Sequence, residues 1–283
     1  MTENGVRGQG PGRVTPPRSL DVGPGESGAS TSATDSCGRF AREITDEKTD
    51  KLIQKQEAFV VRVLAVDVGG TTVKVLATGQ KEPRKFPSGL KMTPQQMASG
   101  VKELTSDWKY DVVSIGYPGL VLKGKPAAEP HNLGRAWVGF NFKSAFRCPV
   151  KIINDAAMQA LGSYNGGLML FLGLGTGLGS AIVAQGIVVP MELAHLSFKN
   201  GTYEDYVGLR GLKRFGKKKW EHYVAYGVAR LVDALHPDDV VLGGGNSKKL
   251  KHLPPGCRRG DNANAFLGGF RLWEDSRPES RSK

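Results

Sequence analysis

The residue best placed to do chemistry in this sequence is an aspartate in the middle of the chain. The segment IINDAA at residues 152–157 joins an apolar, β-branched run to alanines, which predicts a strand that gives way to a helix at Asp155. Reactive groups of α/β folds stand at such strand ends, and a carboxylate there can accept the proton of an alcohol. The alternative is that Asp155 is only the N-cap of the helix. No other acidic residue in the middle of the chain has this setting, so Asp155 is the candidate general base.

Two glycine-rich segments have the composition of phosphate-binding loops. DVGGTT at residues 67–72 and GLGTGLG at residues 173–179 each separate two apolar runs, a pattern typical of a β-hairpin. Glycines let a ligand approach the backbone, and threonine hydroxyls and backbone N–H groups can bind phosphate oxygens. Asp67 could hold a hydrated Mg²⁺ against those phosphates. Either segment alone could be an ordinary hairpin turn, but the pair, with a carboxylate on the first, favours phosphate binding.

A third segment, GGGN at residues 243–246, follows a predicted strand. It resembles a turn that cradles a nucleotide, although a triple glycine after a strand is often only a loop. The candidate phosphate-binding or nucleotide-binding residues are Asp67, Gly69, Gly70, Thr71, Thr72, Lys74, Gly173, Gly175, Thr176, Gly177, Gly244 and Gly245. GxxxxGK[ST] is absent, and no GxGxxG opens a helix after the first strand, so neither a P-loop nor a dinucleotide fold is expected.

Polar residues that could bind a sugar fall in the same stretches of sequence. A bound sugar needs several fixed hydrogen-bond partners, because an unpaired buried hydroxyl costs about 1–3 kcal/mol. The candidates are Asn132, Asn154, Glu192, His195 and Glu204. A lone histidine is more often a structural residue, and no cysteines surround His195 to suggest a metal site.

The remaining sequence alternates predicted strands and helices. Strands are expected at 59–68, 72–77, 111–115, 150–153, 168–172, 180–184 and 239–242, and helices at 95–105, 155–161, 220–235 and 263–271. The two glycine-tipped hairpins lie about a hundred residues apart and suggest a weak internal duplication. We therefore expect an α/β fold of two lobes around a cleft, residues 58–153 and 154–275.

Composition bounds the remaining possibilities. Residues 1–55 are rich in Gly, Pro and Ser and predict a disordered tail, and residues 276–283 predict a frayed end. No apolar run approaches the length of a membrane span and no secretory signal is recognisable, so we expect no membrane. The three cysteines are far apart, which suits a reducing cytoplasm. The formal net charge is +12, and residues 1–45 are neutral overall, so the excess belongs to the folded part.

These segments together resemble the ROK (repressor, open reading frame, kinase) family, and most closely its polyphosphate glucokinases. DVGGTTVK at 67–74 looks like the first phosphate loop of the family, GLGTGLGSA at 173–181 like its second, and IINDAAMQALG at 152–162 like its catalytic segment. The resemblance implies an actin-like (ribonuclease H-like) ATPase fold, a homodimer, and transfer of a phosphoryl group to the 6-hydroxyl of glucose or a similar hexose. It also implies that Asp155 is the base and that the five polar candidates hold the sugar hydroxyls. Asp67 and the two loops would meet Mg²⁺ and the donor phosphates.

The sequence departs from the family pattern in two places. Many relatives carry a cysteine-rich zinc motif just after the histidine, whereas residues 196–203 contain no cysteine, so no zinc is expected. The glycine that usually precedes the histidine is Ala194 here, directly before the sugar-binding candidate His195.

A run of basic residues bears on the phosphoryl donor. Residues 210–219 place six cations in ten positions, and Lys248, Lys249, Lys251, Arg258 and Arg259 add more. A solvated basic face is the ordinary interpretation, but such a surface would also attract a polyphosphate chain, so inorganic polyphosphate or ATP is expected as donor.

Two other classes of function are open. A sugar-sensing regulator would need an N-terminal helix-turn-helix, for which residues 1–50 lack the apolar periodicity. A nucleic-acid binder could use the basic run, but no recognised nucleic-acid-binding motif surrounds it.

Overall fold

The computed structural model describes residues 61–274. The predicted tail at residues 1–55, the first residues of the first predicted strand and the predicted frayed end at 276–283 lie outside the described residues.

The first sheet has five strands and is built around the first predicted hairpin. Its strands are β1 (Val63–Val68), β2 (Thr72–Ala77), β3 (Arg84–Pro87), β4 (Val112–Tyr117) and β7 (Val150–Asn154). The order across the sheet is β3-β2-β1-β4-β7, with β1 antiparallel to β2 and parallel to β4. β1 and β4 are buried along their whole length, as strands covered on both faces must be. The carboxyl ends of β1, β4 and β7 therefore meet at one edge.

Two helices cover one face of this sheet. α2 (Pro94–Leu104) begins at a capping box in which Thr93 and Gln96 satisfy each other's backbone N–H groups, and Pro94 opens the first turn. α3 (Phe142–Phe146) is short and is capped by Asn141. Apolar side chains of both helices pack with those of β1, β2 and β4 in one core. The segment between β4 and α3 also contains the short β5 (Val121–Leu122) and β6 (Lys125–Pro126).

The second sheet repeats the arrangement of the first. Its strands are β8 (Leu168–Leu174), β9 (Leu178–Ala184), β10 (Ile187–Met191), β13 (Asp239–Gly243) and β14 (Cys257–Arg259). The order is β10-β9-β8-β13-β14, again with an antiparallel hairpin beside parallel strands. The internal duplication suggested by the two hairpins is thus present in the topology of the sheets.

One face of the second sheet is covered by two helices that follow β10 in the chain. They are α5 (Tyr203–Val207) and α6 (Leu209–Leu235), and the short elements around them are η1 (Leu193–His195), β11 (Ser197–Phe198), β12 (Gly201–Thr202) and η2 (Gly245–Lys249). Trp220 of α6 is fully buried, and its Nε1 donates to the carbonyl oxygen of Val207 at 2.8 Å. α6 is interrupted at Gly216, where φ is 73° and ψ is 165°, a conformation that only glycine adopts readily.

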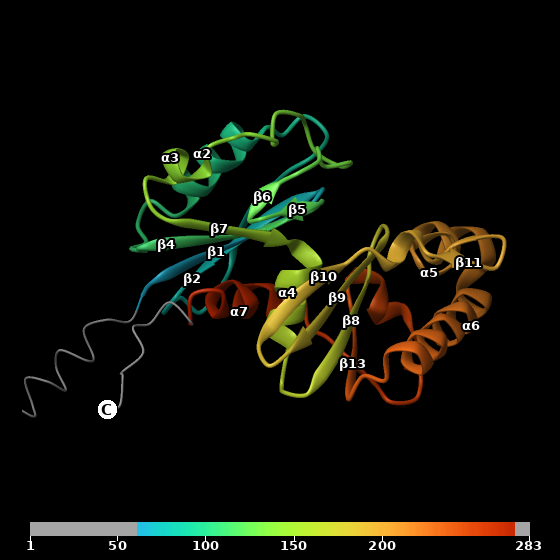
Figure 1. The fold of residues 1–283 in the computed structure, drawn as a ribbon. Helices are drawn as coiled ribbons and strands as arrows, with labels where there is room; N and C mark the ends of the chain where they lie inside the picture. Colours follow the sequence, from blue (N-terminus) through green and yellow to red (C-terminus); the bar gives the residue numbers. More distant parts are fainter. Residues whose placement is uncertain (1–60, 275–283) are drawn as a thin grey trace, which may run out of the picture. The chain divides into compact units, whose positions relative to one another are not determined.

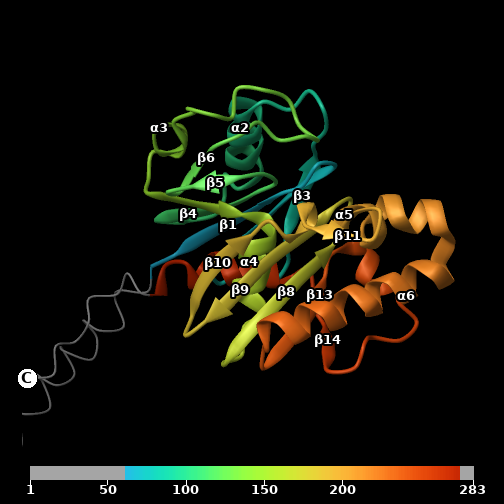
Figure 2. The ribbon, with the colours of Figure 1, turned by 45° about the vertical axis from the view of Figure 1, so that its right-hand side comes forward.

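Two helices lie between the sheets (Figure 1). α4 (Asp155–Ser163) packs on β8 and β9 through alanines and Leu161, and α7 (Asn264–Arg271) packs on β1 and β4. The helices contact each other closely, because a Cβ at Gly162 or at Gly268 would collide with the backbone of the other helix. Figure 2, turned by 45°, shows the same placement. α4 is thus held on one side by the second sheet and on the other by α7.

The predicted α/β fold and both predicted hairpins are confirmed. The predicted strands and helices are present in the described residues, mostly within two residues of their expected bounds. The exceptions are α6, which begins at Leu209 rather than at Trp220, and β1, which begins at Val63 although the prediction also included residues 61 and 62. Within residues 61–274, none of the helices combines the length and apolar character that a membrane span requires. The boundary between lobes at 153/154 stays a prediction.

Candidate active site

Two adjacent polar residues at the start of α4 have different roles. Asn154 is the N-cap, and its Oδ1 accepts hydrogen bonds from the backbone N–H groups of Ala156 at 3.0 Å and Ala157 at 3.2 Å. Asp155 is the first residue of the helix, so the interpretation of Asp155 as the N-cap is wrong. Its Oδ1 accepts from the N–H of Ala156, at 2.8 Å. The start of a helix favours an anion such as this carboxylate.

The surroundings of Asp155 make it a stronger base than an ordinary aspartate. Burial is the largest cause, and the negative charge of Asp67 is the next, so that the pKa of Asp155 rises to about 7. Hydrogen bonds from the backbone oppose the rise, and the charge of Glu192 adds to it. Two carboxylates from different parts of the sequence thus lie near Asp155. A base with a pKa near the working pH is suited to taking a proton from an alcohol.

Asp67 lies at the carboxyl end of β1, and its backbone pairs with Lys74 of β2 and Gly116 of β4. Its side chain is buried, and the Nζ of Lys74 lies 3.4 Å from its Oδ2. Burial raises the pKa of Asp67, while the charge of Lys74 and its hydrogen bond lower it. The structure therefore brings Asp67 and Lys74 together, as two members of the predicted first loop.

The first glycine-rich loop is held in shape by its own backbone and by a serine. The N–H of Gly69 donates to the carbonyl oxygen of Thr72 at 3.1 Å, which closes the turn between β1 and β2. Ser88 Oγ donates to the carbonyl oxygen of Gly69 at 2.6 Å, and the Ser88 N–H donates to that of Thr71 at 3.0 Å. Asn132 lies against this loop, since a Cβ at Gly70 would stand 2.8 Å from the Cβ of Asn132.

The second glycine-rich loop meets the start of α4. A Cβ at Gly179 would stand 2.6 Å from the Cβ of Ala156, so only glycine lets β9 pass this close to the first turn of the helix. The loop is held from two further sides. Asn246 Nδ2 donates to the carbonyl oxygen of Gly175 at 2.8 Å, and the N–H of Leu209 donates to that of Thr176 at 3.2 Å. The third glycine-rich segment, which contains Asn246, therefore lies directly on the second loop.

Four of the five predicted sugar-binding residues contact this site or act on Asp155 by their charge. The fifth, His195, is linked to the site only through Glu192. Glu204 lies on the second loop, where a Cβ at Gly177 would stand 2.5 Å from its Oε2. Glu192 acts on Asp155 through its charge. His195 is exposed, and its Nε2 lies 4.0 Å from the Oε2 of Glu192, which is its link to the group. The remaining candidate, Asn154, donates through Nδ2 to the carbonyl oxygen of Gly119 at 3.2 Å.

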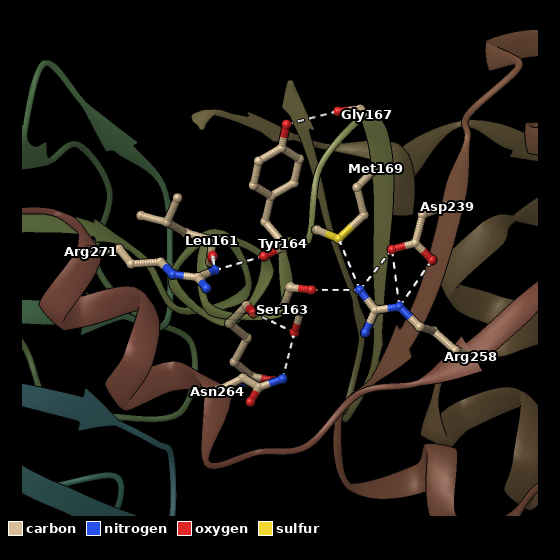
Figure 3. Close-up of polar contacts among 10 residues, drawn as sticks. Leu161, Ser163, Tyr164, Gly167, Met169, Asp239, Arg258, Asn264 and Arg271 are labelled. Atoms are coloured by element: carbon tan, nitrogen blue, oxygen red, sulfur yellow. Dashed lines mark hydrogen bonds and ion pairs between the residues drawn. The ribbon is translucent and has the colours of Figure 1, made fainter. Parts of the chain in front are cut away.

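The far end of α4 is anchored by two arginines (Figure 3). Arg271 Nη1 donates to the carbonyl oxygens of Leu161 at 2.7 Å and Tyr164 at 2.8 Å. Arg258 Nη2 donates to the carbonyl oxygen of Ser163 at 2.5 Å and pairs with Asp239 at 2.7 Å. Carbonyl groups of a last helical turn have no partners within the helix, and cations there also complement the helix dipole. These contacts fix the position of the helix that carries Asp155.

Several of these supporting residues were not predicted from the sequence. Ser88, Asn246, Arg258 and Arg271 each bind a backbone carbonyl oxygen that is distant in sequence. Asn246 alone had a usable signal, because it ends the GGGN segment. The others stand in sequence surroundings without a recognisable motif.

The donor groups of the site suit a hydrated magnesium ion. Mg²⁺ is usually bound by one or two carboxylates together with substrate phosphates. Here the negative charge of Asp67 acts on Asp155 in a poorly solvated place, and a hydrated dication held by Asp67 would relieve that repulsion. Among residues 61–274, no group of three or more His, Cys, Asp or Glu side chains is arranged to hold a metal ion by itself.

The chain is similar to known proteins over the part that contains this site. Residues 63–190 match the ROK family, a span that includes Asp67, Asp155 and the first two glycine-rich loops. A polyphosphate glucokinase of Mycobacterium tuberculosis is 28% identical over 214 residues, which are 67% of this chain and 80% of that protein. The predicted resemblance to the ROK family and its polyphosphate glucokinases is confirmed.

Solved structures show the same fold. An inorganic polyphosphate/ATP-glucomannokinase from Arthrobacter sp. strain KM aligns with a TM-score of 0.64 and 22% identity, over 74% of this chain and 97% of that one. A ROK family transcriptional regulator, homologous to the Escherichia coli MLC protein, aligns with a TM-score of 0.62 and 14% identity, over 83% and 86% of the two chains. The predicted actin-like fold of the ROK sugar kinases is thereby confirmed.

Proposed function

From its ROK family segment at residues 63–190, we propose that this chain is a sugar kinase. It transfers a phosphoryl group from inorganic polyphosphate, from ATP or from both to the 6-hydroxyl of glucose or a related hexose. The single observation that carries the proposal is the setting of Asp155, whose pKa is raised to about 7 by burial and by Asp67, beside a helix start that packs against the second loop. A purely structural N-cap would need none of these features, and Asn154 already fills that role.

Asp155 acts as the general base. The hexose hydroxyl donates a hydrogen bond to the free oxygen of the carboxylate, and its proton moves to that oxygen as the hydroxyl oxygen attacks the terminal phosphorus. A new oxygen–phosphorus bond forms, and the bond to the bridging oxygen of the donor breaks. The shortened donor leaves as an anion with both electrons of that bond.

The loops stabilise the charge of the transferring group. The backbone N–H groups of Thr176 and Gly177 and the Thr176 hydroxyl would hold the transferred phosphate beside Gly175, whose own N–H donates to the carbonyl oxygens of Gly173 and Gly177. Gly70 and Thr71 would hold the rest of the donor. Mg²⁺ held through water by Asp67 would neutralise negative charge on the donor phosphates. The fastening of the second loop by Asn246 and Leu209 keeps these donors in place before the substrate arrives. Gly244 and Gly245, beside Asn246, would cradle a nucleotide when ATP is the donor.

Asn132, Asn154, Glu192, His195 and Glu204 are the proposed partners of the sugar hydroxyls. Asn132 packs against the first loop and Glu204 against the second. The sugar would therefore be held by residues that also lie next to the phosphates. Asn154 has one amide hydrogen left after it donates to Gly119, enough for one sugar hydroxyl. A homodimer, implied by the family resemblance, completes the proposal.

The names of two similar proteins support both inorganic polyphosphate and ATP as the donor. The M. tuberculosis relative is a polyphosphate glucokinase, and the Arthrobacter protein is a polyphosphate/ATP-glucomannokinase. The test is a coupled assay of glucose 6-phosphate formation in which long-chain polyphosphate and ATP are offered separately with Mg²⁺. We expect turnover with at least one donor. Absence of turnover with both donors, across glucose and mannose, would contradict the proposal.

A ROK-type regulator that binds a sugar without turnover is the second candidate. The structural likeness to a ROK transcriptional regulator favours it, and Asp155 with its raised pKa counts against it. A sugar sensor needs no base, so tight hexose binding without any phosphorylation would favour the regulator.

A further inference from the structure

A group of cations on the second half of the chain has no role in the site described above. We define the basic face as Lys213, Arg214, Lys217, Lys218 and Lys219 of α6, together with Lys248, Lys249 and Lys251 after β13. Every one of these side chains is exposed. Within residues 61–274, none of the lysines of the basic face has a carboxylate partner at ion-pair distance, and Arg214 lies over the ring of Phe215 at 5.0 Å. Their charges are therefore available to a ligand.

Both parts of the basic face are attached to the second phosphate loop. α6 begins at Leu209, whose N–H donates to the carbonyl oxygen of Thr176 at 3.2 Å. η2 carries Lys248 and Lys249, and its Asn246 donates to the carbonyl oxygen of Gly175 at 2.8 Å. Each basic element thus begins next to a residue that is hydrogen-bonded to the loop that would hold the transferred phosphate.

The two parts also meet each other away from the loop. Glu221 of α6 accepts a hydrogen bond through Oε1 from the backbone N–H of Lys251 at 2.8 Å. Lys218 and Lys217 precede Glu221 by three and four residues on the same side of the helix, so this contact places them near the segment after η2. Lysines of the two elements of the basic face thus lie near one another at this contact.

The backbone of α6 is fixed before and after Lys217, Lys218 and Lys219. The break at Gly216 redirects the chain between Arg214 and Lys217, and Trp220 anchors the following turn through its buried ring and its bond to Val207. With Trp220 inside, the preceding lysines are left exposed. Repulsion among unpaired like charges disfavours such an arrangement unless an anion neutralises it.

Not every cation of the predicted basic run belongs to this face. Arg258 is bound to Asp239 and the carbonyl oxygen of Ser163, and Arg259 donates to the carbonyl oxygens of Ser247 and Leu250. These two arginines are engaged by the protein itself, so they are not counted in the basic face.

We propose that the basic face is the binding track for a long polyphosphate chain whose end enters the second loop at Gly175–Gly177. The inference rests on the proposed kinase function and names the surface that distinguishes one donor from another. A polyanion with many phosphates reaches the whole track, whereas the three phosphates of ATP reach only the loop and its immediate surroundings. Each neutralised phosphate releases bound counterions, so the affinity for the long chain falls steeply with salt.

The test compares two variants of the full chain with equal loss of charge. The first removes three cations of the track, Lys217→Gln, Lys218→Gln and Lys219→Gln, and glutamine keeps a good helix propensity. The matched control removes three exposed lysines of the first-sheet region, Lys102→Gln, Lys109→Gln and Lys143→Gln. Binding of long-chain polyphosphate is measured by calorimetry at several salt concentrations, and KM is measured for long-chain polyphosphate and for ATP.

We expect the track variant to bind long-chain polyphosphate about tenfold more weakly, with a shallower salt dependence, and to raise its KM similarly. Its KM for ATP and the behaviour of the control variant should stay within about twofold of the unmodified protein. Equal weakening in both triple variants, or an equal loss for ATP, would overturn the track.

Two further measurements distinguish a failure of the track from a failure of the kinase function. Calorimetry reports binding even if no turnover occurs, so loss of the kinase assignment would leave the track still testable. A single-stranded oligonucleotide of matched charge is the competitor. If it binds the unmodified protein as tightly as polyphosphate and loses the same affinity in the track variant, the face is a nucleic-acid surface and the proposal fails.

Discussion

The carboxyl group of Asp67 lies close enough to that of Asp155 for its charge to raise the pKa of Asp155. The two residues stand at the carboxyl ends of β1 and β7, and β4 separates those strands in the sheet. One sheet edge therefore carries both the group that would hold Mg²⁺ and the group that would take the proton. The two carboxylates repel each other in the free protein, and a bound dication with the donor would relieve this repulsion.

The first prediction concerns this pair directly. We expect Asp67→Asn to lower the pKa of Asp155 below its value of about 7, because the variant removes the second-largest cause of the rise. Burial, the largest cause, remains, so the pKa should stay above the ordinary value. Carboxyl-carbon NMR titration of aspartate-labelled protein measures both values. An unchanged titration of Asp155 would show that the two carboxyl groups do not interact.

The second prediction links the same pKa to stability. An aspartate titrates near pH 4 in the unfolded chain and near 7 here, so the folded state holds more protons between these values. The free energy of unfolding therefore falls as pH rises from about 4 to about 7. In Asp155→Asn this loss is absent, and we expect the variant to gain stability over the unmodified protein across that window, by at most about 4 kcal/mol.

Urea denaturation at pH 4.5 and pH 8 measures the difference. Asp107→Asn is the control, since hydrogen bonding to Arg84 lowers the pKa of Asp107 and its carboxyl group is ionised in the folded chain at both pH values. Its deficit in stability should be nearly the same at pH 4.5 and pH 8, because a lowered pKa affects stability only below about pH 4. A stability difference for Asp155→Asn that is the same at both pH values would refute the raised pKa.

The third prediction tests the contact between the second loop and α4. Gly179→Ala would place a Cβ 2.6 Å from that of Ala156, so β9 or the first turn of α4 must shift. We expect kcat to fall by about tenfold or more, because small displacements of positioned groups are costly in catalysis. The double variant Gly179→Ala with Ala156→Gly removes the clash and should recover much of the lost rate. No recovery would mean that Gly179 acts through another contact.

The fourth prediction concerns the far end of α4. Arg271→Met keeps the length of the aliphatic stem but removes the hydrogen bonds to Leu161 and Tyr164. We expect the free energy of unfolding to fall by about 1–3 kcal/mol, since two carbonyl groups lose a charged donor. Lys102→Met, at an exposed site, is the control and should change it by about 0.5 kcal/mol or less. Equal small effects would mean that solvent replaces Arg271 at these carbonyl groups.

The elements around the site were predictable because each has a local cause. Alternation of apolar runs and glycine pairs marked the hairpins at residues 67–72 and 173–179, and helical periodicity marked α2 and α7. The position of Asp155 at the junction of a strand and a helix followed from IINDAA. The division of labour with Asn154 did not, because either residue is a good N-cap and only the backbone conformation decides between them.

What could not be predicted depends on contacts between distant residues. Ser88 reaches the first loop from the end of β3, and Arg258 and Arg271 reach the end of α4 from about a hundred residues further along the chain. α6 was predicted to start only at Trp220, because the cations of its first half outnumber the apolar residues Leu209, Leu212 and Phe215. The first half of α6 is held by the hydrogen bond from Leu209 to Thr176 and ends at the break at Gly216. Apolar periodicity in the sequence reveals neither feature.

The proposed kinase mechanism depends most on Asp155 as the base, and the variant Asp155→Asn tests it most directly. Asparagine preserves the size and can still accept a hydrogen bond from Ala156, but it cannot take a proton. With saturating hexose and either donor, we predict that kcat falls by about 10²–10⁴ while the Kd for the hexose changes by less than about threefold. A variant that binds the hexose normally and turns over at the unmodified rate would contradict the assignment of Asp155 and the kinase mechanism built on it.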